Sequence, residues 1–365
     1  MKYITLGEIC KKGSSNIAQK DLEGNVGDYE IYGASGFIKK VDFYHQEKPY
    51  IAIVKDGAGV GRTMLLPAKS SVIGTMQYIL PNDGIDIRYL YYAISNMNLG
   101  KYYMGAAIPH IYFKDYQSEQ LPVLDIDEQK KIADILARTD ALIADRQAQL
   151  IKLDELVKSR FIELFGDPVL NPYNWETKPF LETGTCKNGM NFHYDDSGVE
   201  LNCLGVGDFK DFSIIDDTSV LPMVSLNEMP SSEYLLQDGD IVFVRSNGNK
   251  ALVGRSVAVY PKNTPTTFSG FCIRYRKFDD AVTIPYLLRA LKSNSIRKQM
   301  MGRGANIQNL NQQILSTIVI PIPPIDLQNQ FATFVEQTDK LKFEVKEALE
   351  KLEILKKSLM QQYFG

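Results

Sequence analysis

The feature that most constrains this chain is an internal repeat. Segments 121–166 and 320–365 align without a gap at a constant shift of 199 residues, so that Gln129 falls on Gln328. A repeat of this kind indicates one structural unit built twice. The chain is therefore two similar halves, each with a globular part followed by a tail of about 45 residues.

Both tails are predicted to be long helices, because their apolar residues recur close to every 3.5 residues. Asp127 and Asp326 are the predicted N-caps, and Gly166 is a predicted C-terminal stop. About 37 helical residues would make a rod on the order of 55 Å long. The apolar positions are 132, 136, 143, 150, 153, 157 and 164 in the first tail, with Thr139, Arg146 and Arg160 interrupting, and 334, 341, 345, 349, 352, 355 and 359 in the second.

A lone helix with such an apolar stripe has to bury it, and the nearest candidate is the equivalent helix of the other half. We therefore expect an antiparallel coiled coil with pseudo-two-fold symmetry. The helices would then act as a spacer between two modules. An ordinary pair of core helices is the alternative.

The globular parts are dominated by short β-rich runs such as "PYIAIVKDGAGVGRTMLL" and "GDIVFVRSNGNKALVGRSVAVY". One helix precedes each tail: the first begins near Asp86, and the second begins near Thr283, with Pro285 in its first turn, and runs to Gly302. The predicted fold class is α+β, with two similar β-rich domains and two long helices. The predicted domains are 1–121 and 167–321 for the globular parts, and 122–166 and 322–365 for the helices.

Length and composition limit the class of protein. The chain has 365 residues, no apolar run of membrane-spanning length, and an N-terminal stretch without the apolar core of a signal peptide. Four cysteines show no paired metal-ligand spacing, and there are only three histidines. We expect a cytoplasmic protein with buried, reduced cysteines, no metal and no cofactor.

The distribution of charge says more than the net charge of −3. Stretches 87–114 and 281–325 contain no Asp or Glu but several Lys and Arg. These stretches occupy similar places in the two halves, which indicates local contact with an anion in each half.

The segment "KDGAGVGRT" (55–63) raises the alternative of a nucleotide-binding loop. It departs from the Walker pattern, since Arg62 stands where the lysine should be. An apolar run ended by Pro67 follows, so the pattern favours a hairpin over a strand, loop and helix. The counterpart "RSNGNKALVGRS" (245–256) keeps the flanks and the Gly-Arg exit but loses the glycine cluster. The stretch is predicted to be a hairpin with a fixed frame and a variable tip.

The sequence contains no pattern that predicts catalysis. Asn171-Pro172-Tyr173 resembles an amino-methyltransferase motif faintly, but it stands beside Asp167-Pro168 at a domain boundary, and a turn is the preferred interpretation. The three histidines show no local catalytic spacing.

Several features together resemble the DNA specificity subunit of type I restriction-modification systems. They are the hairpin in the second half, "GRGANIQNLN" leading into "IVIPIPPIDLQNQ", the helix end "FG" followed by "DPVLNPYNW" (167–175), and the two-fold repeat. The resemblance covers essentially the whole chain. It implies two target recognition domains, each reading one half of a bipartite, asymmetric site on double-stranded DNA.

The resemblance also implies partners. The helices would set the spacer and dock two modification (methyltransferase) subunits. Methyl transfer and cleavage would belong to partner subunits. The resemblance leaves open whether restriction subunits also bind.

The candidate DNA contacts are cations for phosphates and amides or guanidinium groups for base edges. His110 could touch DNA or cap a turn. Tyr102, Tyr103 and Tyr112 could stack on nucleic acid, although core packing is the commoner outcome. The predicted contacts are Lys55, Arg62, His110 and Lys114 in the first half, and Arg245, Asn247, Asn249, Lys250, Arg255, Arg303, Gln308 and Asn309 in the second.

Two other functions remain open from the residues alone. A coiled-coil scaffold that joins proteins without DNA would share the same helices. A free-standing enzyme using the glycine loop would bind a nucleotide or methyl donor by itself.

Overall fold

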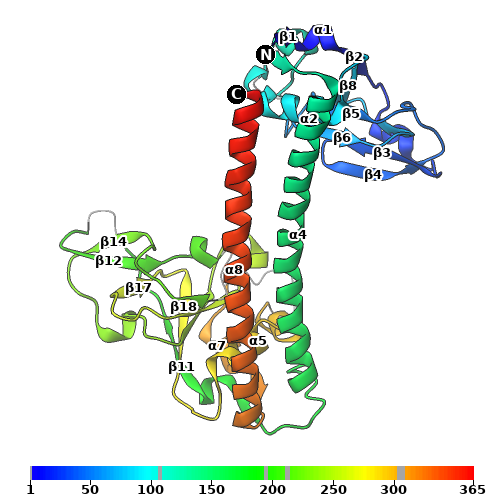
Figure 1. The fold of residues 1–365 in the computed structure, drawn as a ribbon. Helices are drawn as coiled ribbons and strands as arrows, with labels where there is room; N and C mark the ends of the chain where they lie inside the picture. The colour runs from blue at the N-terminus through cyan, green and yellow to red at the C-terminus, as the bar shows by residue number, and fades with distance from the viewer. Residues whose placement is uncertain (1, 106–108, 193–195, 210–213, 302–308) are drawn as a thin grey trace. The chain divides into compact units, whose positions relative to one another are not determined.

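The computed structural model describes the chain except residues 1, 106–108, 193–195, 210–213 and 302–308. It divides into a first unit, residues 1–149 with 345–365, and a second unit, residues 150–344. Each unit holds one globular part and sections of two long helices, α4 (Ile126–Phe165) and α8 (Ile325–Phe364) (Figure 1).

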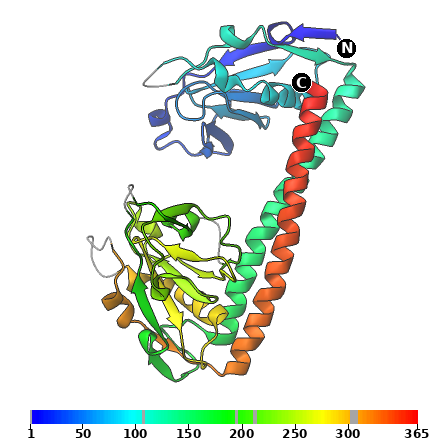
Figure 2. The ribbon, with the colours of Figure 1, turned by 90° about the vertical axis from the view of Figure 1, so that its left-hand side faces the viewer.

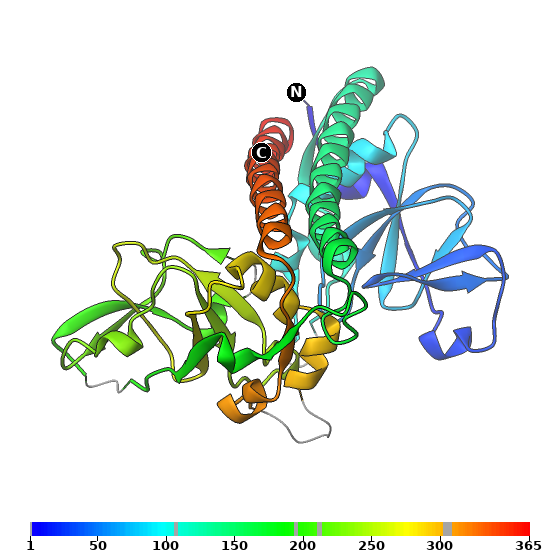
Figure 3. The same ribbon diagram turned by 90° about the horizontal axis from the view of Figure 1, so that it is seen from below.

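The first unit contains three small sheets. The three-stranded sheet lies on the side of this unit away from α4 (Figures 1 and 3). In strand order the sheets are β2 (Cys10–Ser14), β8 (Met76–Pro81), β5 (Tyr50–Val54) and β6 (Thr63–Leu66); β4 (Gly36–Val41), β3 (Tyr29–Gly33) and β7 (Ser70–Val72); and β1 (Lys2–Thr5) with β9 (Gln120–Val123). The helices are α1 (Leu6–Ile9), α2 (Ile87–Asn96) and α3 (Phe113–Tyr116), with 3-10 turns η1 (Gln19–Leu22) and η2 (Leu99–Tyr102).

The second unit is built from corresponding sheets (Figure 2). They are β11 (Gly184–Asn188), β18 (Cys272–Lys277), β15 (Asp240–Val244), β16 (Ser256–Val259) and β13 (Ile214–Ile215); β14 (Met223–Leu226), β12 (Val199–Leu204) and β17 (Thr266–Phe268); and β10 (Thr177–Pro179) with β19 (Val319–Pro321). The helices are α5 (Ile284–Leu291), α6 (Asn294–Met300) and α7 (Gln312–Ser316), with 3-10 turns η3 (Phe180–Glu182), η4 (Val206–Phe209), η5 (Ser232–Tyr234) and η6 (Lys250–Leu252).

The two units share one pattern of strand pairing. In each, a central strand pairs antiparallel with both neighbours: β5 with β8 and β6, and β15 with β18 and β16. In each, the three-stranded sheet contains one parallel pair, β3 with β7 and β12 with β17. The predicted α+β fold with a duplicated β-rich part is confirmed, and β13 is an additional edge strand of the second unit.

Each unit has a core that joins its globular part to the long helices. In the second unit, Phe161 and Phe165 of α4 contact Tyr286 of α5 and Phe331 of α8, with ring centroids 4.9–5.7 Å apart. In the first unit, the start of α4 shares a buried cluster with α2 and with Phe364 at the end of α8. Since the end of one helix meets the start of the other in each unit, the pairing of α4 with α8 is antiparallel.

The predicted stripe of α4 is confirmed. Thr139 lies on this stripe and is buried, because its hydroxyl donates to the carbonyl of Ile135 within the same helix. On α8 two predicted positions are wrong: Leu341 and Leu355 are 51% and 47% exposed. Lys342 and Lys356 take their places on the stripe, and their ammonium groups pair with Asp154 and Asp140 of α4.

The predicted ends of the helices need three corrections. The cap of α4 is Asp125, not Asp127, because the Asp125 carboxylate accepts from the amides of residues 127 and 128. Asp326 lies inside the first turn of α8. The helix that was expected to run to Gly302 ends at Leu291, because Ser293 caps the separate helix α6; Gly302 lies outside the described residues.

A buried glutamine ties α4 to the globular part of the first unit. Gln129 has no exposed surface. Its Oε1 accepts from the amide of Asp86, 2.9 Å away, at the N-terminus of α2. Its Nε2 donates to the carbonyls of Gly84 (3.2 Å) and Leu124 (2.9 Å). One amide group thus holds the start of α2 against the start of the long helix.

The second unit repeats this contact, which we call the glutamine latch. Gln328 of α8 is also fully buried. Its Oε1 accepts from the amide of Thr283, and its Nε2 donates to the carbonyls of Ala281 and Pro323. Each of these three hydrogen bonds is 2.8 Å long. The latch therefore joins equivalent points in both units.

A pair of tyrosines reinforces the latch. The Tyr89 hydroxyl of α2 donates to the Pro122 carbonyl (2.7 Å), and the Tyr286 hydroxyl of α5 donates to the Pro321 carbonyl (2.8 Å). Both carbonyls belong to the strand that leads into a long helix. Each unit therefore has a side chain from the long helix bonded to the globular part and a side chain from the globular part bonded to the strand before the long helix.

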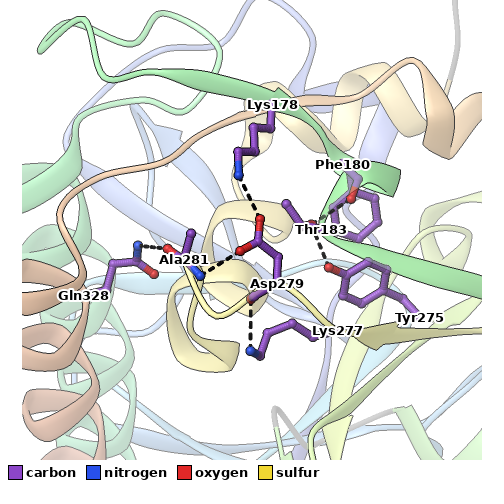
Figure 4. Close-up of polar contacts among 8 residues, drawn as sticks. All are labelled: Lys178, Phe180, Thr183, Tyr275, Lys277, Asp279, Ala281 and Gln328. Carbon is purple, nitrogen blue, oxygen red and sulfur yellow. Dashed lines mark hydrogen bonds and ion pairs between the residues drawn. The ribbon is translucent and has the colours of Figure 1, made fainter.

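Figure 4 shows how the latch of the second unit continues into the sheet. The Asp279 carboxylate accepts from the amide of Ala281 (2.8 Å) and from the ammonium of Lys178 in β10 (2.9 Å). Because the Ala281 carbonyl in turn accepts from Gln328, the strand, the loop and α8 form one hydrogen-bonded chain.

Replacing Gln129 by Met keeps a similar volume but removes the latch. One amide and two carbonyls then lose their partners, so we expect the free energy of unfolding to fall by about 1–3 kcal/mol. Gln147→Met is the matched control, because Gln147 is an exposed residue of the same helix. Urea denaturation of both variants measures the difference, and equal stabilities would contradict the role of the latch.

Candidate DNA-recognition surface

The predicted hairpin is present in both units and has the same frame. The Val54 amide donates to the Arg62 carbonyl (2.9 Å), and the Gly61 amide donates to the Val54 carbonyl (2.8 Å). In the second unit Val244 makes the same two bonds, to Arg255 and from Gly254, at 2.9 and 2.8 Å. The fixed frame that the sequence predicts is confirmed.

The tip of the hairpin differs between the units. In the first unit Gly57, Gly59 and Gly61 all have positive φ, between 85° and 89°. A Cβ on Gly61 would lie 2.4 Å from the Gly100 amide nitrogen, because the tip packs against η2. These glycines therefore serve backbone conformation and close packing.

In the second unit two asparagines shape the tip. The Asn247 side-chain oxygen accepts from the amide of Asn249 (2.8 Å), and that of Asn249 accepts from the amide of Ala251 (3.1 Å). Such side-chain turns hold the loop, and Gly248 between the two asparagines does not have a positive φ.

A second loop lies beside each hairpin. His110 bridges to Asp56, and the Ile111 amide donates to the Lys55 carbonyl (2.9 Å). In the second unit Asn309 bridges to Ser246, and the Leu310 amide donates to the Arg245 carbonyl (2.8 Å). His110 and Asn309 are 199 residues apart, as in the repeat of the tails, and they occupy equivalent places in their units.

Three predicted contacts of the first unit lie in one polar row. The His110 Nδ1 lies 3.0 Å from Asp56, which also pairs with Lys55 at 3.8 Å. The His110 ring packs edge-on against Tyr112, and the Lys114 ammonium lies 5.2 Å from the centre of that ring. Asp56 was not predicted, although its position next to Lys55 in the sequence is a signal for such a pair.

Arg62 does not join this row. Its guanidinium donates to the Ala34 carbonyl (3.2 Å) in the turn between β3 and β4. Its contribution to the surface is therefore separate from that of Lys55 and His110, although both Arg62 and Lys55 belong to one hairpin.

The second unit brings Arg245 and Asn309 together through the two loops already described. Arg245 also donates from Nη1 to the Gly270 carbonyl (3.2 Å). Arg255 is exposed at the exit of the hairpin. Three other predicted contacts cannot be placed: Arg303 and Gln308 lie outside the described residues, as does the side chain of Lys250.

The acid-free stretches contribute less free charge than their sequence indicates. Arg88 pairs with Asp134 at 2.7 Å, and Lys101 pairs with Glu119. Lys292 is half-buried beside Arg289, and burial lowers the pKa of its ammonium to about 8. Arg88 and Lys101 are therefore paired at the surface, whereas the half-buried Lys292 serves the fold.

The tyrosines of the first unit also differ from expectation. Tyr103 and Tyr112 are 58% and 45% exposed, so core packing is the wrong interpretation for both. Tyr102 is half-buried and its hydroxyl bonds to Glu119. Tyr112 therefore adds an exposed aromatic ring to the row that contains His110.

The described residues contain no constellation that predicts catalysis. No group of three His, Cys, Asp or Glu within them could hold a metal ion. Burial raises the pKa of the Cys10 thiol to about 12, which disfavours the reactive thiolate. The segment around Asn171 is a turn as predicted, with the Asp167 carboxylate accepting from the amides of Val169 and Leu170. None of the helices described here could cross a membrane.

Comparisons with known proteins agree with this geometry. The family model for the type I restriction modification DNA specificity domain matches residues 1–153 and 211–355. The specificity subunit of the type I restriction enzyme MjaVIII from Methanocaldococcus jannaschii is 24% identical over 337 residues, covering 85% of this chain and 77% of that subunit. The StySPI specificity subunit from Salmonella potsdam is 24% identical, covering 71% of this chain and 60% of its own length.

Solved structures show the same fold. The S subunit of a type I restriction-modification system from M. genitalium superimposes with a TM-score of 0.64 at 16% identity, covering 100% of this chain and 96% of that one. A chain from a study of complex assembly in a type I system gives a TM-score of 0.57 at 14% identity, covering 99% and 97%.

The duplicated hairpin frame on paired long helices, together with the match to the specificity-domain family, defines a DNA-recognition subunit. The chain belongs to the type I restriction-modification DNA specificity family. It is a specificity subunit, a non-catalytic component of such a system.

Two alanine substitutions separate the roles of the hairpin glycines. Gly57 and Gly61 have the same φ of 85°, but only Gly61 faces backbone atoms closer than 3.0 Å. We expect Gly57→Ala to cost about 1–2 kcal/mol of stability from its conformation, and Gly61→Ala to cost about 1–3 kcal/mol more from overpacking. Denaturant unfolding measures both, and equal losses would show that the close contact with η2 is unimportant.

Proposed function

We propose that each globular part reads one half of a bipartite, asymmetric site on double-stranded DNA. The observation that carries this proposal is the duplicated hairpin frame with unlike side chains: Lys55 and His110 in one unit stand where Arg245 and Asn309 stand in the other. Equivalent positions with different hydrogen-bonding groups would select different base edges. The two half-sites are therefore unlike.

The predicted contacts divide into two kinds. Lys114 and Arg255 are suited to phosphates, because a cation can bind the backbone without reading sequence. Arg245 and the asparagines are suited to base edges, since guanidinium pairs with guanine and amide with adenine. In the first unit, Asp56 would keep Lys55 and His110 in place and limit non-specific attraction.

The long helices would set the spacer and dock two modification (methyltransferase) subunits. Both helices carry exposed leucines related by the shift of 199 residues, and these support docking of two equal partners. They are Leu142 and Leu156 of α4 and Leu341 and Leu355 of α8, between 47% and 51% exposed. Methyl transfer would belong to those partners, and restriction subunits would join the same assembly.

Co-expression of the chain with its methyltransferase partner and genome-wide mapping of modified bases tests the proposed function. We expect one split motif with two unlike halves and a fixed spacer. Weakening of DNA binding with added salt should follow in vitro. A palindromic motif would contradict unlike half-sites, and no motif at all would favour a scaffold without DNA specificity.

Introducing a negative charge at the exposed leucines tests docking. Leu142→Asp and Leu341→Asp place a carboxylate in the proposed interface, so each should weaken assembly with the methyltransferase by roughly tenfold or more. Leu170→Asp is the control, because Leu170 is 79% exposed in the loop after α4. Size-exclusion chromatography with light scattering reads the stoichiometry, and full assembly of both helix variants would exclude this face.

A further inference from the structure

A tight turn occupies the same place in both units, between the parallel strand and the strand next to the hairpin. It spans residues 73–76 in the first unit and 269–272 in the second. The amide of Met76 donates to the carbonyl of Ile73 (3.0 Å), and that of Cys272 donates to Ser269 (2.8 Å). The third residue of the turn is Thr75 in one unit and Phe271 in the other.

The hairpin holds this third residue identically in the two units. The Thr75 carbonyl accepts from the amides of Lys55 (3.0 Å) and Asp56 (3.3 Å). The Phe271 carbonyl accepts from the amides of Arg245 (2.8 Å) and Ser246 (3.3 Å). The backbone position is therefore fixed by two successive amides, whichever side chain it carries.

The glycine before it is fixed as well. The Gly74 amide donates to the Ile17 carbonyl (2.7 Å), and the Gly270 amide donates to the Met190 carbonyl. In the second unit the Arg245 guanidinium also donates to the Gly270 carbonyl. The turn, the hairpin and the loop carrying His110 or Asn309 are thus joined at one point of each unit.

The side chains at this point face solvent. Thr75 is exposed, and Phe271 is 60% exposed although it is a large apolar group. A single exposed aromatic residue is common on protein surfaces and is not evidence by itself. Thr75 and Phe271 are distinguished by a shared backbone frame and by different side chains beside residues already proposed to meet DNA.

We propose that Thr75 and Phe271 are specificity-determining residues, which contact base edges in the major groove. The inference rests on the proposed function. Phe271 provides an apolar surface for the 5-methyl group of a thymine, a contact that phenylalanine makes in major grooves. Thr75 provides a smaller methyl group and a hydroxyl, which suit a different base pair in the other half-site.

Phe278 supplies the matched control. It follows β18 at the end opposite Phe271, and it is 62% exposed. Its amide donates to the Thr183 carbonyl, away from the hairpin loops. Phe278→Ala therefore removes an equally exposed ring from the other end of β18 without touching the proposed surface.

The test uses the chain assembled with its methyltransferase partners and duplexes that carry the mapped motif. Replacing single thymines of the second half-site by deoxyuridine removes only the 5-methyl group. At one position we expect the wild-type assembly and Phe278→Ala to lose roughly tenfold in methylation rate, as befits one base contact. The methylation rate of Phe271→Ala on the natural duplex should be lower than that of the wild type by a similar factor. Deoxyuridine at that position should not lower the rate of Phe271→Ala any further.

The unlike halves provide an internal control. Phe271→Ala should relax the second half-site and leave the first unchanged, whereas Thr75→Phe should change the first alone. The inference would be overturned if Phe271→Ala kept both the wild-type second half-site and the wild-type methylation rate. It would also be overturned if deoxyuridine reduced the rates of the wild type and of Phe271→Ala by the same factor. Failure of the proposed function is a separate outcome, because the wild-type assembly would then give no split motif.

Discussion

The rest of each unit depends on one buried amide group, that of Gln129 or Gln328. It satisfies three backbone groups that would otherwise be left without partners where a long helix, the turn before it and a globular part meet. Each lost partner would leave a buried polar group, which is costly. The same contact in two units lets their loops differ while the attachment to the helix stays the same.

Beyond this attachment, the two units share the same backbone frame in their hairpins but carry different side chains on it. The hairpin bonds at Val54 and Val244 agree to 0.1 Å or better, yet one tip is shaped by glycines and the other by asparagines. The neighbouring loop presents His110 or Asn309 at one place. A subunit built in this way can alter a half-site by changing side chains without changing its backbone.

Much of the fold could be predicted from the sequence, because the gapless repeat and the 3.5-residue spacing report directly on two long paired helices. The hairpins and the starts of α2 and α5 followed from local signals such as Asp86 and Thr283. Leu341 and Leu355 were misplaced because spacing alone ignores lysines. Lys342 and Lys356 can lie along the seam with their charged ends paired to carboxylates of the other helix.

The candidate site was predicted less completely, for a physical reason. Residue type does not reveal which partner a long side chain finds, so the bond from Arg62 to Ala34 and the burial of Lys292 were not foreseen. Asp56 and Phe271 were missed because their importance comes from contacts between segments far apart in the sequence.

We propose that the latches transmit the length of the paired helices to the distance between the two half-sites. Deleting one heptad from each helix at facing positions, residues 143–149 and 347–353, keeps the seam in register and shortens each helix by about 10 Å. Base-modification mapping with the methyltransferase partner should then show the same two half-sites with a spacer shorter by about three base pairs. An unchanged spacer, with both half-sites still recognised, would contradict the account.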